Sequence, residues 1–305
     1  MNKKRFENTK ALTFSSIMSA ISIVLILVTF FSGDIGLFLI FILPLCASLV
    51  SVYVDFKYSL IYFISTFLIS CFDLQLALFI VIPSLVSGII FGKLIKIYLQ
   101  GYYIIIINTL CLLLLQIGAT YLIDFIYKID LIDSIGKILK LNEVTFNNAY
   151  YLFLFLLSLI EISINYLIIS SELKKFDFEF KEKKDHFLLN FFLEIVLIIA
   201  SVTLMFFNHQ YGFLFVGVSL FFGVILAYYN FSFYQNKKII IIQMPLYLIS
   251  VILIMILFSY VKNEYRPYLI LIILISQLIP SLYIIIYQKI VKKGKISHTL
   301  FDKIK

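Results

Sequence analysis

Residues 102–127 decide the fold class of this chain: YYIIIINTLCLLLLQIGATYLIDFIY. The stretch holds one charged side chain, Asp124, and exceeds the about 20 apolar residues that a helix needs to cross a bilayer at about 1.5 Å per residue. A helix that is apolar on every side over this length is typical of a membrane span or a deeply buried core. The stretch therefore predicts a transmembrane helix.

The composition extends this prediction to the whole chain. Of its 305 residues, 62% are hydrophobic and 14% are charged, and the mean hydropathy is +1.06. A soluble domain is about half apolar and about a quarter charged. This composition excludes a cytosolic enzyme, a secreted disulfide scaffold, a disordered tail and a nucleic-acid-binding module. We expect an all-α, polytopic integral membrane protein that contacts lipid and no nucleic acid.

A scan for similar runs predicts about ten transmembrane helices, the first of them uncleaved. Nine runs are long enough to cross, and they cover Thr13–Phe31, Ile35–Tyr53, Leu76–Leu94, Tyr102–Tyr127, Ala149–Ile169, Phe187–Phe207, Tyr211–Phe231, Ile239–Val261 and Pro267–Tyr287. The tenth, Tyr58–Phe72, is short and is either a full span or half of a re-entrant pair. Whether this run crosses the membrane decides the orientation of every later span.

The positions of Lys and Arg predict the orientation, because short cytoplasmic loops carry the excess of these residues. With ten spans and both termini inside, only five of the 25 basic residues lie outside, namely Lys128, Lys137, Lys140, Lys262 and Arg266. With nine spans, the later loops change sides and most basic residues lie outside. We therefore expect ten spans with both termini cytoplasmic. The formal net charge of +8 then indicates contact with anionic lipid.

One charged loop divides the predicted spans into two blocks. Residues 172–186 carry five lysines and five acids and form the longest charged connection on the inner side. Before this loop lies a block of six spans, residues 1–171. After it come four spans, residues 187–291, and a basic cytoplasmic tail, residues 292–305.

Small residues four apart on a helix let two helices approach closely in lipid. Three spans carry such ridges, which we expect to pack against other helices or to dock a partner. The first span has Ser15 and Ser19 beside Ser16 and Ala20; the others carry Ser84, Gly88 and Gly92, and Ser219, Gly223 and Ala227.

Polar residues inside the predicted spans are candidates for a binding site, because an ionisable group in hydrocarbon is costly. Glu161 lies about 18 Å into its span by helix rise, and Ser158 and Asn165 share its helix face. Asn108 on the preceding span lies at a similar depth, and Gln116 lies nearer the outer side. These residues either line a path for a solute or proton, or form a neutral hydrogen-bonded contact between two helices.

Cofactor and catalytic signatures are not found in the sequence. The three cysteines and three histidines have no ligand-like spacing, so we expect no metal site and no cofactor. The sequence has no H-E-x-x-H, G-x-S-x-G, P-loop or dinucleotide-binding pattern, so we expect a protein that is not an enzyme.

The opening stretch from Lys10 to Ser22, which includes the start of the first span, resembles the first helix of the substrate-binding S components of energy-coupling factor (ECF) vitamin transporters. In those helices a small-xxx-small ridge docks on the coupling subunit, and Ser16 and Ala20 match it here. The six-span block is similar to an S component in size and helix count. The whole chain resembles the YybS-like uncharacterised membrane proteins of Gram-positive bacteria. The resemblance implies a location in the cell membrane of a bacterium, solute binding from outside, and an ECF-type coupling subunit or another membrane protein as a partner.

Three functions therefore stay open at this point. The first is a transport-related protein that binds a small solute from the outer side, without an ATPase of its own, at Glu161, Asn165, Ser158, Asn108 and Gln116. The alternative is a non-enzymatic scaffold or regulator that binds other membrane proteins. The third, an intramembrane enzyme acting on lipid with Glu161 as acid or base, has no motif in its favour.

Overall fold

A computed structural model describes residues 8–32, 39–97, 99–138, 143–175, 187–234 and 237–274, and residues 276, 278–279, 282–283 and 286. All regular structure in these ranges is helical, as the composition predicts. The chain divides into two compact units, Met1–Lys184 and Asp185–Lys305. The division lies near the C-terminal end of the predicted charged loop.

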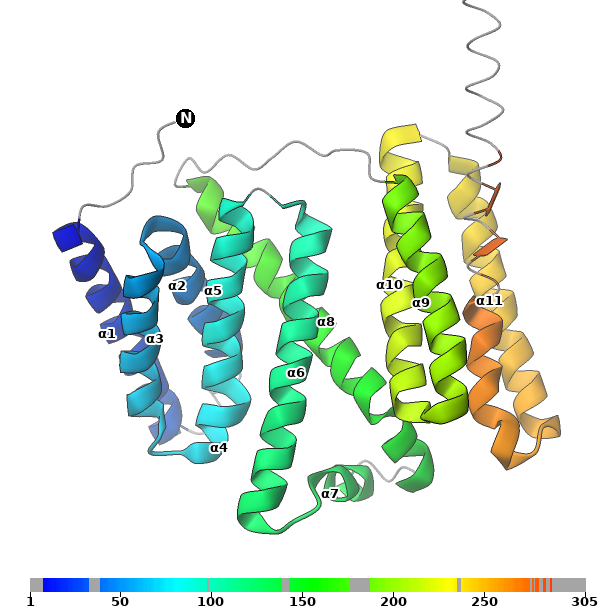
Figure 1. The fold of residues 1–305 in the computed structure, drawn as a ribbon, viewed down its shortest axis with the longest axis horizontal. Coiled ribbons are helices and arrows are strands. Elements are labelled where there is room, and N and C mark those ends of the chain that lie inside the picture. Colours follow the sequence, from blue (N-terminus) through cyan, green and yellow to red (C-terminus); the bar gives the residue numbers. More distant parts are fainter. Residues whose placement is uncertain are drawn as a thin grey trace, which may run out of the picture. The chain divides into compact units, whose positions relative to one another are not determined.

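The first unit is a bundle of helices that run up and down between its two ends (Figure 1). In chain order they are α1 (Asn8–Ser32), α2 (Leu39–Tyr53), α3 (Phe56–Ser70), α4 (Leu74–Leu76), the π-helical turn η2 (Ala77–Val81), α5 (Ile82–Lys96), α6 (Gly101–Tyr127), α7 (Leu131–Ile138) and α8 (Glu143–Lys175). The short α7 lies across the lower end in Figure 1. The upper end in Figure 1 holds the α2–α3 connection, the α5–α6 connection and the C-terminal end of α8. We call it the basic end.

Six helices of the described chain are long and apolar enough to cross a membrane: Asn8–Phe31, Leu74–Lys96, Gly101–Tyr127, Phe146–Lys175, Leu189–Phe207 and His209–Leu226. Three more apolar helices are shorter, Phe41–Tyr53, Phe56–Ser70 and Leu248–Tyr260. The chain is therefore an all-α, polytopic membrane protein. The total of ten spans stays a prediction, because the last one, Pro267–Tyr287, falls partly outside the described residues.

The short predicted span is a helix of its own, α3, with 15 residues. It begins after Asp55 at the basic end and packs beside α1. A tight turn then leads into α4, where the Asp73 carboxylate accepts a hydrogen bond of 3.1 Å from the backbone N–H of Leu76. From there α4, η2 and α5 form one continuous helix back to the basic end. The chain thus runs the length of the unit on both sides of this turn.

Close packing between α2 and α5 builds the core of the first unit. A Cβ atom added at Gly88 would stand 2.4 Å from the Pro44 carbonyl oxygen, and one at Gly92 would stand 2.6 Å from the Ser48 carbonyl oxygen. Ser84, one turn earlier on α5, is 1% exposed. Only residues without larger side chains allow the two backbones to lie this close. The ridge Ser84–Gly88–Gly92 is thus buried inside the unit.

The two ridges of α1 face in different directions. Ser19 shares a hydrogen bond of 2.7 Å with Ser65 of α3, and Ser22 shares one of 2.8 Å with Tyr62. Ser15 and Ser19 are buried, whereas Ser16 and Ala20, about 100° further around the helix, are exposed. The inner ridge holds α1 on α3, and the outer ridge is uncovered in the described chain.

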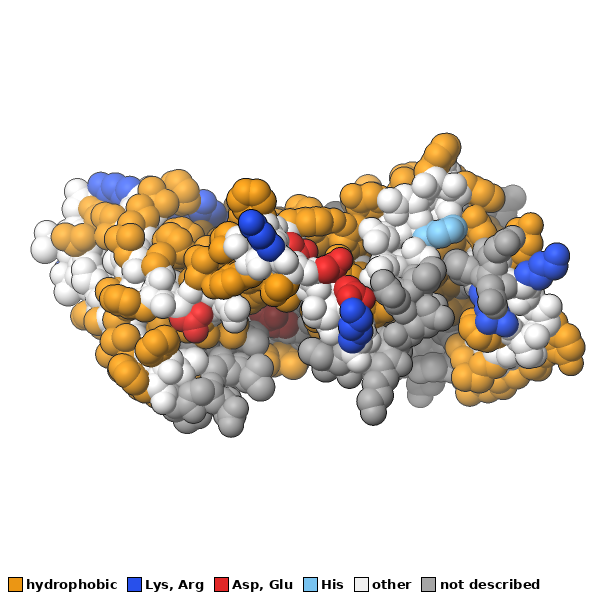
Figure 2. Space-filling view, turned by 90° about the horizontal axis from the view of Figure 1, so that it is seen from below, with side chains coloured by type: hydrophobic (Ala, Val, Ile, Leu, Met, Phe, Trp, Pro, Cys, Tyr) orange, Lys and Arg blue, Asp and Glu red, His pale blue; other side chains and the backbone are white. Residues whose placement is uncertain are grey.

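Charge separates the two ends of the first unit. Six lysines lie at the basic end, on or beside the helix termini there: Lys10, Lys57, Lys93, Lys96, Lys174 and Lys175. The opposite end carries Asp73, Asp124, Asp130 and Asp133 with Lys128 and Lys137. Figure 2 looks at this opposite end, where carboxylates and a few basic side chains stand among hydrophobic ones. The separation follows the charge bias that predicted the orientation.

Two features of the first unit differ from the prediction, namely the end of α8 and the presence of α7. The helix α8 continues to Lys175, so Glu172–Lys175 is helical and not the beginning of a loop. Leu173 explains this, because it is 0% exposed within a core cluster and extends the buried stripe of the helix. The rest of the predicted loop, from residue 176 onward, lies outside the described residues. The helix α7 was not predicted, because eight residues are too few for a span.

The second unit contains α9 (Phe187–Phe207), α10 (His209–Tyr234), α11 (Lys237–Tyr260) and the 3-10 helix η3 (Asn263–Ile270). The α9–α10 hairpin is tight, since a Cβ at Gly212 would stand 2.5 Å from the Met205 side chain. Ser219 and Gly223 of the predicted ridge are buried in α10. The third ridge residue, Ala227, belongs to α10, but its side chain lies outside what the structure describes. The basic tail, residues 292–305, lies outside it too.

Candidate functional site

The candidate site is a polar seam between α6 and α8, formed by the five predicted residues Asn108, Gln116, Ser158, Glu161 and Asn165. Both helices are apolar over most of their length, so the seam is a break in an otherwise hydrophobic contact. The structure brings two of these residues into direct contact. The Ser158 hydroxyl donates a hydrogen bond of 2.9 Å to Oε1 of Gln116.

Hydrogen bonds between tyrosines and their neighbours fix the register of α6 against α8. Thr120 and Tyr150 share one of 3.0 Å, and Tyr121 and Tyr151 share one of 2.8 Å. The Ser158 contact with Gln116 lies further along both helices, toward the basic end. Residue numbers therefore fall along α6 as they rise along α8, so the two helices are antiparallel. The same register, continued by two turns, places Asn108 at the level of Asn165.

Both asparagines are completely buried, each with 0% of its surface exposed. Asn108 lies one turn from Ile104 and from Leu112, and these two residues belong to the core cluster that also contains Ile162 and Ile169 of α8. The amide of Asn108 is thus surrounded on its helix by apolar side chains. Neither its Oδ1 nor its Nδ2 has a hydrogen-bond partner among the described residues. Such an amide is costly, because buried polar groups are normally paired.

Glu161 lies on the flank of the seam and not at its centre. At about 100° per residue, its Cα is roughly 60° around α8 from that of Ser158, on the side away from Ile162. Ser158 and Ile162 are both 0% exposed, whereas Glu161 is half-buried. Within the described chain, no hydrogen bond or ion pair involves its carboxylate. Glu161, the residue that stood out most in the sequence, is therefore less enclosed than Asn108, Ser158 and Asn165.

The seam is closed by α7 at the end opposite the lysines. The Asp124 carboxylate accepts a hydrogen bond of 3.0 Å from the backbone N–H of Leu131, which fixes the start of α7. Gly136 of α7 lies against Phe146, which is 4% exposed, so the short helix covers the first turns of α8. A solute that enters the seam from this end would pass beneath α7.

Sequence reasoning missed the pocket that the structure shows at the end of α1. It has a volume of about 330 Å³, and its lining residues come from α1 and from the α3–α4 turn. Asp73, between two apolar runs, was the available signal, but its role depends on which helices meet there. As to metals, no group of three His, Cys, Asp or Glu side chains that could hold an ion occurs in the described ranges.

Comparison with known proteins gives a family match over part of the chain. Residues 20–151 match the model of a family described as "Predicted membrane protein (DUF2232)". The match runs from α1 to the first turns of α8, so it covers less than half of the chain and none of the second unit. No curated protein and no solved structure matches the chain. The comparisons and the fold together identify a multi-pass membrane protein, similar over its first unit to this family.

Proposed function

We propose that this protein is transport-related: its first unit binds a small polar solute from the outer side, in the seam between α6 and α8. The observation that carries this proposal is the buried amide of Asn108, which has no partner in the described chain. In a membrane-spanning helix such a group costs several kcal/mol unless something polar binds it. A solute with both a donor and an acceptor would satisfy Oδ1 and Nδ2 together.

The neighbouring residues support a solute of modest size. Gln116 and Ser158 lie two turns nearer the outer side and are already paired with each other. Both side chains can replace this hydrogen bond with hydrogen bonds to a solute, so that the free-energy cost of solute entry is small. In this proposal the protein has no ATPase of its own and is not an enzyme. Its transport would draw energy from a partner, such as the ECF-type coupling subunit that the resemblance implies.

The orientation belongs to the same proposal: a bacterial cell membrane, cytoplasmic termini and α7 on the outer side. The lysines at the basic end support it. Native Cys71 offers a direct test, because it is exposed at the α3–α4 turn whereas Cys46 is buried. A membrane-impermeant maleimide applied to intact cells should label the protein, and Cys71→Ser should abolish the labelling. Labelling that requires broken cells would reverse the orientation.

Solute binding is tested by mass spectrometry of small molecules that copurify in mild detergent. A panel of vitamins, nucleobases and metals should then show which compound raises the melting temperature. Asn108→Leu, of similar size, should lose both the copurified compound and the stabilisation. Thr109→Val is the matched control, because Thr109 is equally buried but bonds its own helix at the Ile105 carbonyl, 2.9 Å away. Copurification that survives in Asn108→Leu would contradict the proposal, as would a wild type that binds nothing.

One observation favours the alternative, a scaffold or regulator that binds other membrane proteins. Ser16 and Ala20 lie on the exposed side of α1, where they leave room for a second helix to approach closely. Crosslinking from Ser16→Cys in membranes should then give one defined neighbour. A ligand-free protein that still crosslinks to one partner would favour the scaffold.

A further inference from the structure

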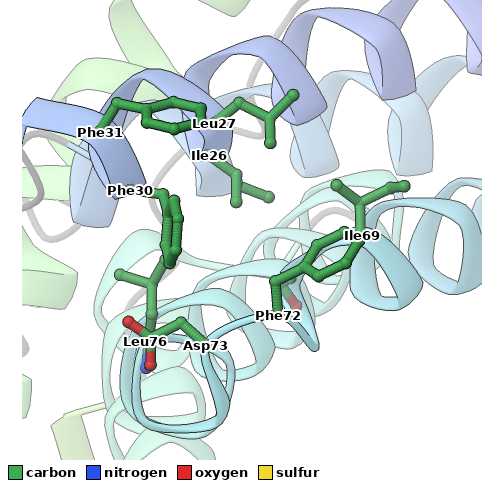
Figure 3. A pocket seen from close by; sticks show the side chains of 9 residues that line it. Ile26, Leu27, Phe30, Phe31, Ile69, Phe72, Asp73 and Leu76 are labelled. Carbon is green, nitrogen blue, oxygen red and sulfur yellow. The ribbon is translucent and has the colours of Figure 1, made fainter.

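The pocket at the end of α1 combines aromatic walls with a single fixed carboxylate. Figure 3 shows Phe30 and Phe31 of α1 on one side, and Phe72, Asp73 and Leu76 of the α3–α4 turn on the other. Its volume of about 330 Å³ is at the lower end of the range for small-molecule sites, about 300–1,000 Å³. The pocket lies at the end of the unit opposite the lysines, apart from the α6–α8 seam.

Three phenylalanine rings border the pocket, and two of them are set at different angles. Phe30 and Phe31 stand nearly perpendicular, with an interplanar angle of 82° and centroids 5.4 Å apart. Phe31 is 83% exposed and Phe72 is 79% exposed, so both rings are accessible. The face of a phenyl ring carries partial negative charge and attracts cations within about 6 Å of its centroid.

Asp73 supplies the only formal charge among the described residues that line the pocket. Its Oδ1 accepts the hydrogen bond from Leu76 N, 3.1 Å away, and this bond holds the carboxylate in place at the start of α4. No lysine or arginine is among those lining residues. An uncharged apolar occupant would remove water from this carboxylate without replacing it, which is unfavourable. An anionic lipid headgroup would be repelled.

We propose that this pocket is a binding site for a small organic cation, an ammonium group with an apolar body. The ammonium would lie near the Asp73 carboxylate and against the faces of the phenyl rings, and the apolar body would occupy the remaining volume. This site is independent of the solute site proposed in the seam.

The test compares phenyltrimethylammonium with tert-butylbenzene, which has the same shape and no charge. Binding is measured by calorimetry and by ligand-observed NMR, with the full chain in nanodiscs of zwitterionic lipid. The wild type should bind the cation at least about ten-fold more tightly than the neutral compound, a difference of about 1.4 kcal/mol. Equal binding of the two compounds would identify an apolar cavity for lipid tails and overturn the proposal, as would no binding of either.

Two variants distinguish the effect of the pocket carboxylate from the effect of the overall negative charge at this end of the unit. Asp73→Asn keeps an oxygen that can accept from Leu76 N and should weaken cation binding about ten-fold. Asp133→Asn removes the same charge from α7, outside the pocket, and should leave the affinity unchanged. Equal weakening in both variants would show a diffuse surface potential and contradict the site. Asn108→Leu should bind the cation fully, so a failure of the seam proposal leaves this result intact.

Discussion

Replacing Gly88 by alanine should separate α2 from α5, and the structure gives the size of the effect. The added Cβ would stand 2.4 Å from the Pro44 carbonyl oxygen and 2.6 Å from the Ala47 Cβ. Ordinary van der Waals contact begins at 3.4 Å, so the helices must move apart by about 1 Å. A gap of that size forfeits about a quarter to a half of the dispersion energy of each contact. The clash should cost about 1–3 kcal/mol, because backbone atoms cannot move aside as a flexible side chain can.

Gly118→Ala is the matched control, because nothing lies within 4 Å of a Cβ at that position of α6. Both variants gain the same helix propensity, about 1 kcal/mol, so their difference isolates the clash. The free energy of unfolding is measured by titration with SDS in mixed micelles, and the melting temperature in mild detergent supports it. Gly118→Ala should be neutral or slightly stabilising. If Gly88→Ala is as stable as Gly118→Ala, the close α2–α5 contact is wrong.

Three further predictions follow from contacts in the first unit. Ser19→Leu should lower the melting temperature, because it crowds the buried contact with α3, whereas Ser16→Leu on the exposed side should leave it unchanged; equal effects would contradict the two-faced α1. Gln116→Leu and Ser158→Ala should each cost about 0.5–1.5 kcal/mol of unfolding free energy, and a double-mutant cycle should give a coupling of about 0.6 kcal/mol; zero coupling would contradict the hydrogen bond. Asp124→Ala should release the start of α7 and speed its cleavage by protease added to the protein in mild detergent, with an unchanged rate as the contrary result.

The helical membrane fold could be predicted from the sequence, because an apolar run long enough to span a bilayer needs no knowledge of its neighbours. Which face of α1 is buried could not be predicted from the sequence. Ser15 and Ser19 have the same spacing as Ser16 and Ala20, and only the position of α3 decides which pair is buried. Helix α7 escaped prediction because eight residues give too little periodicity.

The candidate site was predicted in part. Depth along a helix follows from residue number, so Asn108 and Asn165 were expected at similar levels, and the register agrees. The pairing of Gln116 with Ser158 depends on how the two helices are rotated, which depth alone does not give. Glu161 attracted attention as a charge in an apolar span, yet its flanking position depends on which face of α8 is packed.

The length of α3 has a consequence for the surrounding lipid. Its 15 residues span about 22 Å, whereas the hydrocarbon core of a typical bilayer is about 30 Å thick. Hydrophobic mismatch of this size makes the bilayer thin locally around α3, with headgroups and water drawn inward. The exposed phenyl rings at its far end, and Lys57 at its start, then lie close to the lipid headgroups. The acyl-chain length of the host membrane thereby becomes a control on the stability of the first unit.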